Sequence, residues 1–116
     1  MKRLLGRVTG GLCAVSALLG APAAAAETVK VGMKNGVFTP AAVTIHVGDR
    51  VVWINDDEEG RHRVDFDDPS VGASGDLKSG KEYAFVFSKA GEFTYNCRYH
   101  KDYGMRGKVV VASPTK

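Results

Sequence analysis

Short runs in which apolar and polar residues alternate recur along this chain. In residues 43–47 (VTIHV) every second residue is apolar, which is the period of a β-strand with one buried face. Turn-forming pairs such as Gly48 and Asp49, or Ala90 and Gly91, separate the runs. The predicted strands are residues 28–33, 42–47, 50–54, 62–66, 83–87, 92–97 and 108–112.

No segment carries an apolar stripe at helical spacing, so the pattern predicts an all-β chain. Short strands with regular turn signals are typical of an antiparallel β-sandwich, here of about seven or eight strands. Two stretches lack strand alternation. Residues 55–61 are polar and mostly acidic, and residues 67–81 are expected to form a long loop with one helical turn.

Alternation also assigns the faces of individual side chains. His46 lies between apolar neighbours and is expected to face water. His62 shares its face with Val64 and Phe66 and is expected to point inward. The aromatic residues expected in the core by the same rule are Trp53, Phe85, Phe87, Phe93 and Tyr95.

The last part of the chain carries the clearest candidate chemistry. Cys97, His100 and Met105 are spaced C-x2-H-x4-M ahead of the final predicted strand. Thiolate, imidazole and thioether together suit copper, because a mixed sulfur and nitrogen shell holds both Cu(I) and Cu(II). A trigonal site of two imidazoles and a thiolate needs one more histidine, and His46 and His62 are the candidates. The inward-facing His62 is the predicted second histidine ligand.

Residues 62–67 (HRVDFD), residues 91–97 (GEFTYNC) and the Cys-His-Met motif resemble the plastocyanin, pseudoazurin and amicyanin group of cupredoxins. The resemblance covers roughly residues 28–112, and the ligand spacing is nearer to plastocyanin and pseudoazurin than to the shorter loop of amicyanin. It implies a Greek-key β-sandwich and one type 1 copper ion per chain. The implied trigonal ligands are His62, Cys97 and His100, with Met105 as a weak axial ligand.

Two residues depart from the family pattern. Tyr99 stands where many relatives have proline before the second histidine, and Arg63 stands where many have asparagine after the first. The ligand set is unaffected, but hydrogen bonds to the sulfur and the stiffness of the loop tune the reduction potential. Asn55 and Asn96 are candidates for hydrogen bonds near the metal, or for ordinary strand-end hydrogen bonding.

Residues 1–26 are predicted to be a cleaved secretory signal peptide. Lys2, Arg3 and Arg7 precede an apolar run, and residues 24–26 are alanines that offer a cleavage site. The apolar run is shorter than the roughly 20 residues that span a bilayer, so membrane insertion is not expected. Residues 27–116 are then predicted to be a single copper-binding domain in the periplasm.

The formal charge of +3 comes from the predicted signal peptide, which holds three of the 16 basic residues and none of the 13 acidic ones. Without it the charges balance, so a nucleic-acid partner is not indicated. Cys13 would leave with the signal peptide, and Cys97 would remain without a partner for a disulfide. A metal that binds it as thiolate explains a lone thiol in an oxidising compartment.

Together these features favour a small blue-copper electron-transfer protein. The alternative is a periplasmic copper-binding or copper-delivery protein with the same ligands; a metal-free interaction module would make the Cys, His and Met pattern a coincidence. An enzyme is not expected, because four protein ligands leave no open position for a substrate.

The expected partners are a redox donor and a redox acceptor, for example a cytochrome or a dehydrogenase, which dock transiently near His100. The resemblance implies that the electron leaves through the exposed edge of His100, beside Tyr99, Tyr103 and Met105. The acidic residues 56–59 would favour a basic partner. The cations near the ligands favour an acidic partner, and an acidic partner is the prediction. These cations are Arg61, Arg63, Arg98, Lys101 and Arg106.

Overall fold

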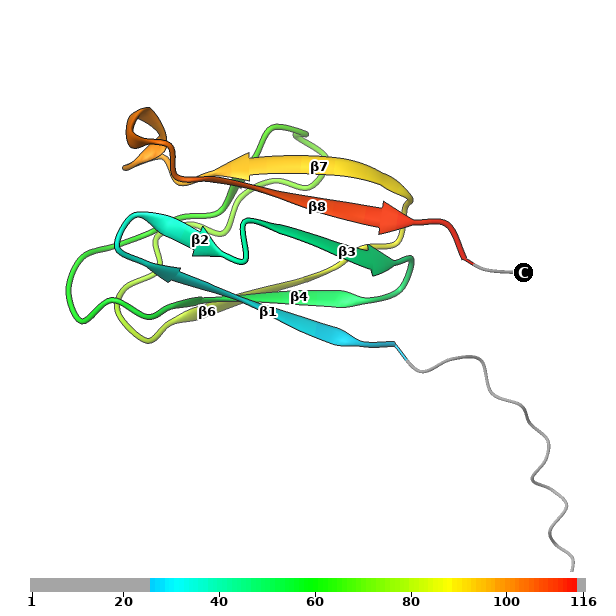
Figure 1. Cartoon of the computed structure of the whole chain (residues 1–116), viewed down its shortest axis with the longest axis horizontal. Coiled ribbons are helices and arrows are strands. Elements are labelled where there is room, and N and C mark those ends of the chain that lie inside the picture. Colours follow the sequence, from blue (N-terminus) through cyan, green and yellow to red (C-terminus); the bar gives the residue numbers. More distant parts are fainter. Residues whose placement is uncertain (1–25, 115–116) are drawn as a thin grey trace, which may run out of the picture.

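Two β-sheets form a sandwich in the computed structural model, which describes residues 26–114 (Figure 1). The predicted signal peptide lies outside these residues except for Ala26. The strands are β1 (Thr28–Lys34), β2 (Val37–Thr39), β3 (Ala42–His46), β4 (Arg50–Asn55), β5 (Asp65–Phe66), β6 (Glu82–Val86), β7 (Gly91–Asn96) and β8 (Arg106–Ala112). One sheet has the order β2-β1-β4-β6 and the other β3-β8-β7-β5, which confirms the predicted sandwich.

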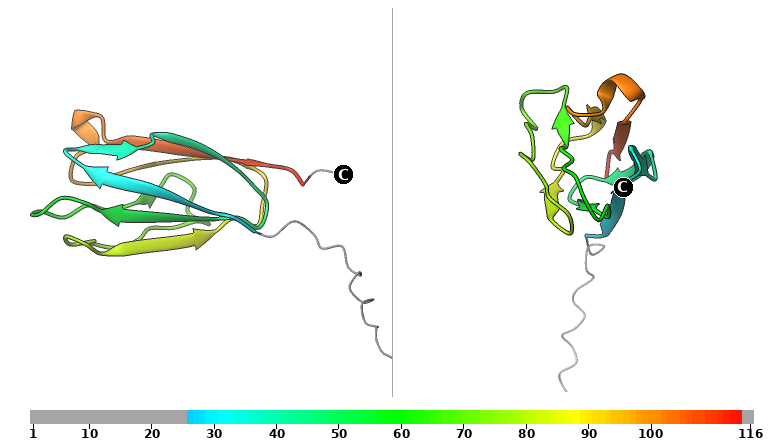
Figure 2. Two further views of the ribbon diagram at one scale, coloured as in Figure 1. Left: turned by 60° about the horizontal axis from the view of Figure 1, so that its bottom comes forward. Right: turned by 90° about the vertical axis from the view of Figure 1, so that its left-hand side faces the viewer.

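Two strand pairs are parallel, so both sheets of the predicted antiparallel sandwich are mixed. β1 runs parallel to β4, and β3 runs parallel to β8, whereas the other neighbouring strands are antiparallel. Parallel neighbours need a long connection, and here the chain visits the opposite sheet between β1 and β4 (Figure 2). Alternation of side chains predicts which face of a strand is buried but not the direction of its neighbour.

In three segments the structure differs from the prediction. β2 is not predicted, because three residues are too few to show a period. The predicted strand 62–66 is regular only at Asp65–Phe66, and His62 forms an isolated bridge with Leu77. Residues 67–81 form a long loop with one turn, as expected, in which the N–H groups of Val71 and Gly72 donate to the carbonyl of Asp68 at 3.0 and 3.3 Å. A 3-10 turn that was not predicted lies at Lys101–Tyr103. Within the described part of the chain, no helix is long and apolar enough to cross a membrane.

The aromatic side chain of Trp53 joins the two sheets at the centre of the core. It is fully buried on β4, and its ring meets Phe66 of β5 and Tyr95 of β7 edge to face, with centroids 5.7 and 5.5 Å apart. Such pairs add stability beyond the area that they bury. Phe87, Phe93 and Tyr95 are buried as predicted, while Phe85 is half-buried on the edge strand β6.

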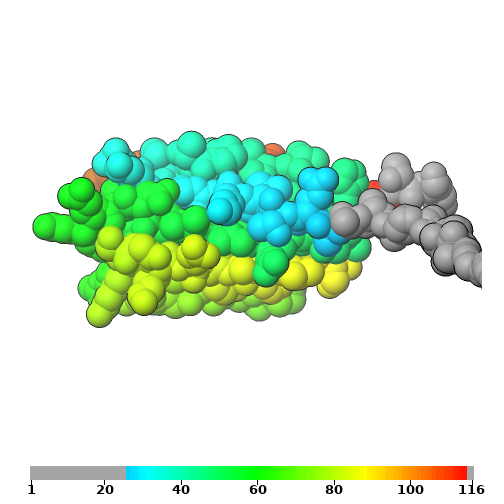
Figure 3. All heavy atoms as spheres, turned by 90° about the horizontal axis from the view of Figure 1, so that it is seen from below, coloured from blue at the N-terminus to red at the C-terminus, as the bar shows by residue number. Residues whose placement is uncertain are grey.

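The two ends of the sandwich carry different features. The β7–β8 loop and the loop that follows β4 lie at one end, and both ends of the described chain lie at the other (Figure 1). On one outer face, β1, β4 and β6 lie side by side (Figure 3). The loops at the first end contain all four predicted metal ligands.

Gly107 is required by the close approach of a buried ring. It lies on β8 opposite Tyr95, and a Cβ at this position would overlap the phenol group of Tyr95, which is 1% exposed. We expect Gly107→Ala to lower the free energy of unfolding by about 1–3 kcal/mol in urea denaturation, as overpacking does. Gly32→Ala on β1 is the matched control, since its Cβ would meet the carboxylate end of the exposed Asp56, which can rotate away. Equal losses in both variants would contradict this explanation.

Asp49 connects the turn after β3 to the start of the described chain. Its carboxylate accepts hydrogen bonds from the backbone N–H groups of Glu27 and His46, both at 2.9 Å. These hydrogen bonds hold the pKa of Asp49 below its usual 3.8. The ionised carboxylate therefore stabilises the fold at neutral pH, and this contribution is lost as the pH falls through the lowered pKa.

We expect the melting temperature of Asp49→Asn to lie below that of the wild type at neutral pH. The difference should shrink as the pH falls below about 4, because the wild-type carboxylate then becomes protonated as well. Thermal unfolding followed by circular dichroism at several pH values measures this difference. A gap that stays constant across the series would mean that the charge of Asp49 is not the stabilising feature.

Candidate metal centre

The loop between β7 and β8 carries three of the four predicted ligands and is closed by its own backbone. The N–H of Cys97 donates to the carbonyl of Met105 at 3.1 Å, which extends the β7–β8 pairing by one step. The N–H of His100 donates to the carbonyl of Cys97 at 3.0 Å, and the N–H of Met105 donates to the carbonyl of His100 at 3.2 Å. These hydrogen bonds fix the spacing of the ligand backbone.

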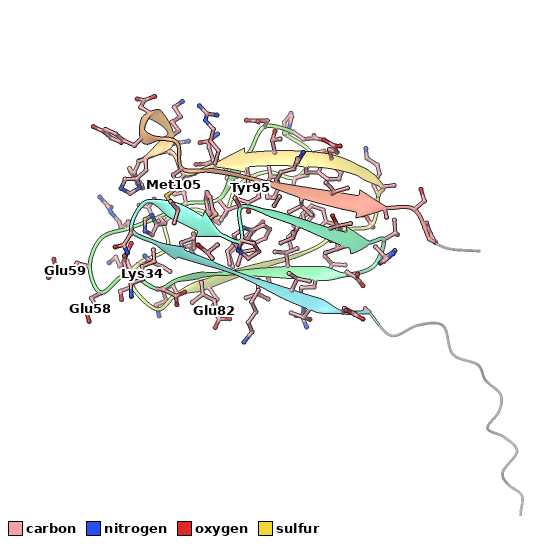
Figure 4. All side chains as sticks on the ribbon, viewed as in Figure 1. Lys34, Glu58, Glu59, Glu82, Tyr95 and Met105 are labelled. Atoms are coloured by element: carbon pink, nitrogen blue, oxygen red, sulfur yellow. The ribbon has the colours of Figure 1, made fainter. Side chains whose placement is uncertain are left out.

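Gly104 ends the 3-10 turn inside this loop. Its φ of 89° is left-handed, and its N–H donates to the carbonyl of Lys101 at 3.1 Å. Glycine adopts this conformation without a steric penalty. The chain then returns to β8 with Met105, whose fully buried side chain points into the space between the sheets (Figure 4).

His62 comes from the other loop at the same end of the sandwich. Its backbone N–H donates to the carbonyl of Leu77 at 3.1 Å, and its carbonyl accepts from the N–H of Leu77 at 2.8 Å. Its ring is 3% exposed, and Nε2 lies 2.6 Å from Oδ2 of Asp57. A carboxylate only accepts, so Nε2 carries a proton, and in the neutral ring Nδ1 then keeps its lone pair. This hydrogen bond also holds the pKa of Asp57 below its usual value.

Three donor atoms from the two loops face one another. They are Nδ1 or Nε2 of His62 and His100 and Sγ of Cys97, all within 4.8 Å of one another. Sγ of Cys97 lies 3.8 Å from Nδ1 of His62 and 3.4 Å from Nδ1 of His100. Two imidazoles and a thiolate are the donor set of a blue-copper site. Since Asp57 binds the far nitrogen of His62, the nitrogen nearer to the sulfur is free for a metal, and the residues fit copper.

A backbone N–H points at the sulfur. The N–H of Arg63 lies 3.4 Å from Sγ of Cys97, which is fully buried. Hydrogen bonding to a copper-bound thiolate sulfur tunes the reduction potential. The residue after His62 therefore reaches the predicted site through its backbone N–H.

Asn55 has the strand-end role that was one of the two alternatives left open by the sequence. Asn55 donates from Nδ2 to the carbonyl of Leu77 at 2.8 Å and accepts from the N–H of Asp57 at 2.9 Å. It thereby supports the backbone that positions His62, which is the strand-end alternative. Asn96 is half-buried at the end of β7, where it pairs with Asp65 and Arg106 in the sheet.

His46 lies far from the other predicted donors. It is the last residue of β3 and pairs with Ala112, at the opposite end of β8 from the ligand loop. Its side chain is 62% exposed. The expectation that His46 faces water is confirmed.

A second carboxylate, Asp76, lies beside the centre and was not predicted. Its Oδ1 accepts a hydrogen bond from the hydroxyl of Tyr99 at 2.6 Å, and its Oδ2 pairs with Arg61 at 3.2 Å. The hydrogen bond lowers the pKa of Asp76 and raises the pKa of Tyr99. The two residues are 23 positions apart in an irregular loop and a turn, so no pattern in the sequence relates them.

An open depression of about 690 Å³ lies next to the candidate centre. His62 and His100 both contribute to its lining, together with the charged residues Asp57, Glu59 and Arg61. Glu58 and Glu59 project from the loop after β4, at the same end as Met105 (Figure 4). Solvent therefore reaches the half-buried His100 through a surface of mixed charge, whereas His62 is buried.

Single-copper proteins of this class bind their metal between two histidines and a cysteine at one end of a β-sandwich. The chain belongs to the family described as the cupredoxin-like domain, whose family model matches residues 8–111. It is 40% identical to the chloroplastic plastocyanin of Tetradesmus obliquus over 98 residues, which cover 74% of this chain and 67% of that protein. The resemblance to cupredoxins is confirmed.

Amicyanin is similar in both sequence and structure. The chain is 36% identical to amicyanin from Paracoccus versutus over 90 residues, covering 74% of this chain and 66% of that protein. The solved structure of a Cu(I) amicyanin variant superposes with a TM-score of 0.65 at 31% identity, covering 73% of this chain and 82% of that one. Copper is thus the cofactor that the family and the donor set of this chain both define.

Proposed function

We propose that this protein is a small exported blue-copper electron carrier that passes one electron at a time between redox partners. The observation that carries the proposal is the convergence of His62, Cys97 and His100 within 4.8 Å at one end of the sandwich. When bound there, copper supplies a one-electron couple between Cu(II) and Cu(I). Similarity to plastocyanin and amicyanin supports the same function.

The proposed ligands are the two imidazoles and the thiolate, with Met105 as the axial fourth. The complete burial of Met105 and its place at the closure of the loop support this role. With four protein ligands, no position would remain for a substrate, so we propose carriage of electrons and no catalysis.

Backbone hydrogen bonds hold the donors in place. His62 is paired with Leu77, and Cys97 and His100 are joined through the loop hydrogen bonds. A donor set fixed in this way rearranges little when the charge at its centre changes by one unit, because its dipoles are already oriented. Little rearrangement favours rapid electron transfer.

His100 is the proposed route for the electron. It is half-buried, whereas His62 and Cys97 are buried. Two exposed aromatic side chains belong to the same loop: Tyr99, which is 41% exposed, and Tyr103, which is 86% exposed. They provide apolar area for a brief contact with a partner around His100.

We propose an acidic docking partner. Arg98, Lys101 and Arg106 are exposed on or beside the loop that carries the ligands. Arg98 and Lys101 also line an open depression next to Asn96. Glu58 and Glu59, which would favour a basic partner instead, project from the loop after β4 (Figure 4). Arg98 and Lys101 belong to the loop that carries His100, so we propose that their positive charge steers the partner.

Export to the periplasm is proposed from the predicted signal peptide at residues 1–26. The backbone nitrogen of Glu27 lies 2.9 Å from Oδ1 of Asp49. Cleavage after Ala26 would turn this nitrogen into a charged α-amino group, and the hydrogen bond would become an ion pair. Residues 27–116 would then form one domain whose first residue is bound by the fold.

A copper-delivery protein is the second candidate. The observation that favours it is the open depression, because both His62 and His100 line it and a metal could reach them from solvent. A delivery protein would keep its metal exchangeable and favour Cu(I). The two candidates therefore differ in how they bind Cu(II).

Titration of the exported chain with Cu(II), followed by visible absorption, distinguishes these functions. We expect an intense visible band that saturates at one copper per chain, because a thiolate–Cu(II) bond absorbs strongly. Cys97→Ser should lose the band, whereas His46→Ala, the matched control, should keep it. A zinc-loaded sample should be colourless. Bound but colourless Cu(I), easily removed by a chelator, would support delivery instead.

Reversal of the loop cations tests the docking surface. We expect Arg98→Glu combined with Lys101→Glu to slow oxidation of the reduced protein by ferricyanide roughly ten-fold at low salt, because this anionic oxidant is steered by positive charge. The loss should vanish at high salt. Lys30→Glu combined with Lys89→Glu changes the net charge equally but lies on β1 and on the β6–β7 turn. Equal slowing in both double variants would remove the ligand loop as the docking surface.

A further inference from the structure

The two residues that depart from the family pattern meet at one carboxylate. The hydroxyl of Tyr99 donates to Oδ1 of Asp76 at 2.6 Å, and Nη1 of Arg63 lies 3.5 Å from the same oxygen. Tyr99 precedes His100 and Arg63 follows His62 in the chain. Asp76 therefore joins the neighbours of two candidate ligands that come from different loops.

The guanidinium of Arg63 is fixed from a second side. Its Nη2 and Nε lie 2.9 and 3.2 Å from the carboxylate of Asp65, and both side chains are less than one-fifth exposed, at 17% and 18%. With the side chain bound by Asp65 and Asp76, rotation of the Arg63 backbone is restricted. The backbone N–H of this residue is the group that points at Sγ of Cys97.

The ring of Tyr99 is also restrained on its face. The guanidinium carbon of Arg61 lies 5.3 Å from the centroid of the ring, and Nη1 of Arg61 pairs with Asp76 at 3.2 Å. The side chain of Arg61 is 54% exposed, so salt weakens this pair more than the contacts of Arg63. Both the face and the hydroxyl of Tyr99 thus have a partner on the loop opposite.

Proline stiffens a loop by fixing φ, and tyrosine does not. A loop with Tyr99 in place of proline lacks this restraint on φ, and side-chain contacts add a restraint to its backbone hydrogen bonds. The carboxylate of Asp76 offers such a restraint, because it accepts from the ligand loop and binds the cations that flank His62.

We propose that Tyr99, Asp76 and Arg63 form a clamp that positions the Cys97–Met105 loop against the His62 segment. The clamp thereby sets the distances between the donor atoms and directs the Arg63 N–H toward Sγ of Cys97. The clamp acts through the ligands and touches no metal, so its members are positioning residues. The effect of the clamp on copper rests on the proposed function, whereas the contacts that join the two loops are part of the fold.

Reactivity of the Cys97 thiol measures the clamp without copper. Cys97 is fully buried, so a loosened loop should expose it to an aromatic disulfide reagent. We expect Tyr99→Phe, which keeps the ring but not the hydroxyl, to react roughly ten-fold faster than the wild type, as after loss of a charge-assisted hydrogen bond. Tyr103→Phe removes a hydroxyl from the same loop at an 86% exposed position and should leave the rate unchanged.

A double-mutant cycle separates the clamp from a general loss of stability. Asp76→Ala removes both the acceptor for Tyr99 and the charge that binds Arg63, and it should raise the thiol reaction rate on its own. If the two residues act as one unit, Tyr99→Phe should add little in the Asp76→Ala background. Independent effects that multiply, or rates equal to that of the wild type in both single variants, would overturn the proposal.

Copper release provides the second measurement. We expect Tyr99→Phe to lose Cu(II) to a chelator roughly ten-fold faster than Tyr103→Phe, with a shifted visible band. Unchanged release and an unchanged band would overturn the role of the clamp at the metal. A wild-type protein that forms no visible copper band would overturn the proposed function, and the thiol rates would still decide whether the loops are clamped.

Discussion

The hydrogen bond from the N–H of Cys97 to the carbonyl of Met105 is the constraint on which the metal end depends. It is the last step of the β7–β8 pairing, and everything between the two residues must form a loop of fixed span. The register behind it is set in the core, where Tyr95 lies opposite Gly107 with its ring over the glycine. A slip by one residue would turn Tyr95 out of the core and move the candidate ligands with it.

The candidate centre combines this regular part of the fold with an irregular one. His62 belongs to no regular strand; an isolated bridge to Leu77 holds its backbone, and Asn55 binds the carbonyl of Leu77. Asp57 orients the ring from outside. The ligand loop therefore gets its geometry from the sheet, whereas His62 gets its geometry from polar contacts with a few loop residues.

The sequence predicted the parts of the structure that repeat with a short period. Alternation separated His46, which is exposed, from His62, which is buried, and it identified Trp53 and Tyr95 as core residues. It could not predict the parallel neighbours of β1 and β3, because the alternation of apolar and polar residues in one strand does not depend on the direction of the neighbouring strand. The contacts of Asp57 and Asp76 were also beyond it, since each joins residues through loops that have no period.

The position of the chain ends has a practical consequence. Both ends of the described chain, Ala26 and Pro114, lie at the end of the sandwich away from the ligand loop (Figure 1). A linker attached to either terminus would therefore leave the copper-binding end facing outward. Molecules tethered to an electrode in this way would share one orientation, with the edge of His100 directed to solution and the length of the sandwich between the site and the surface.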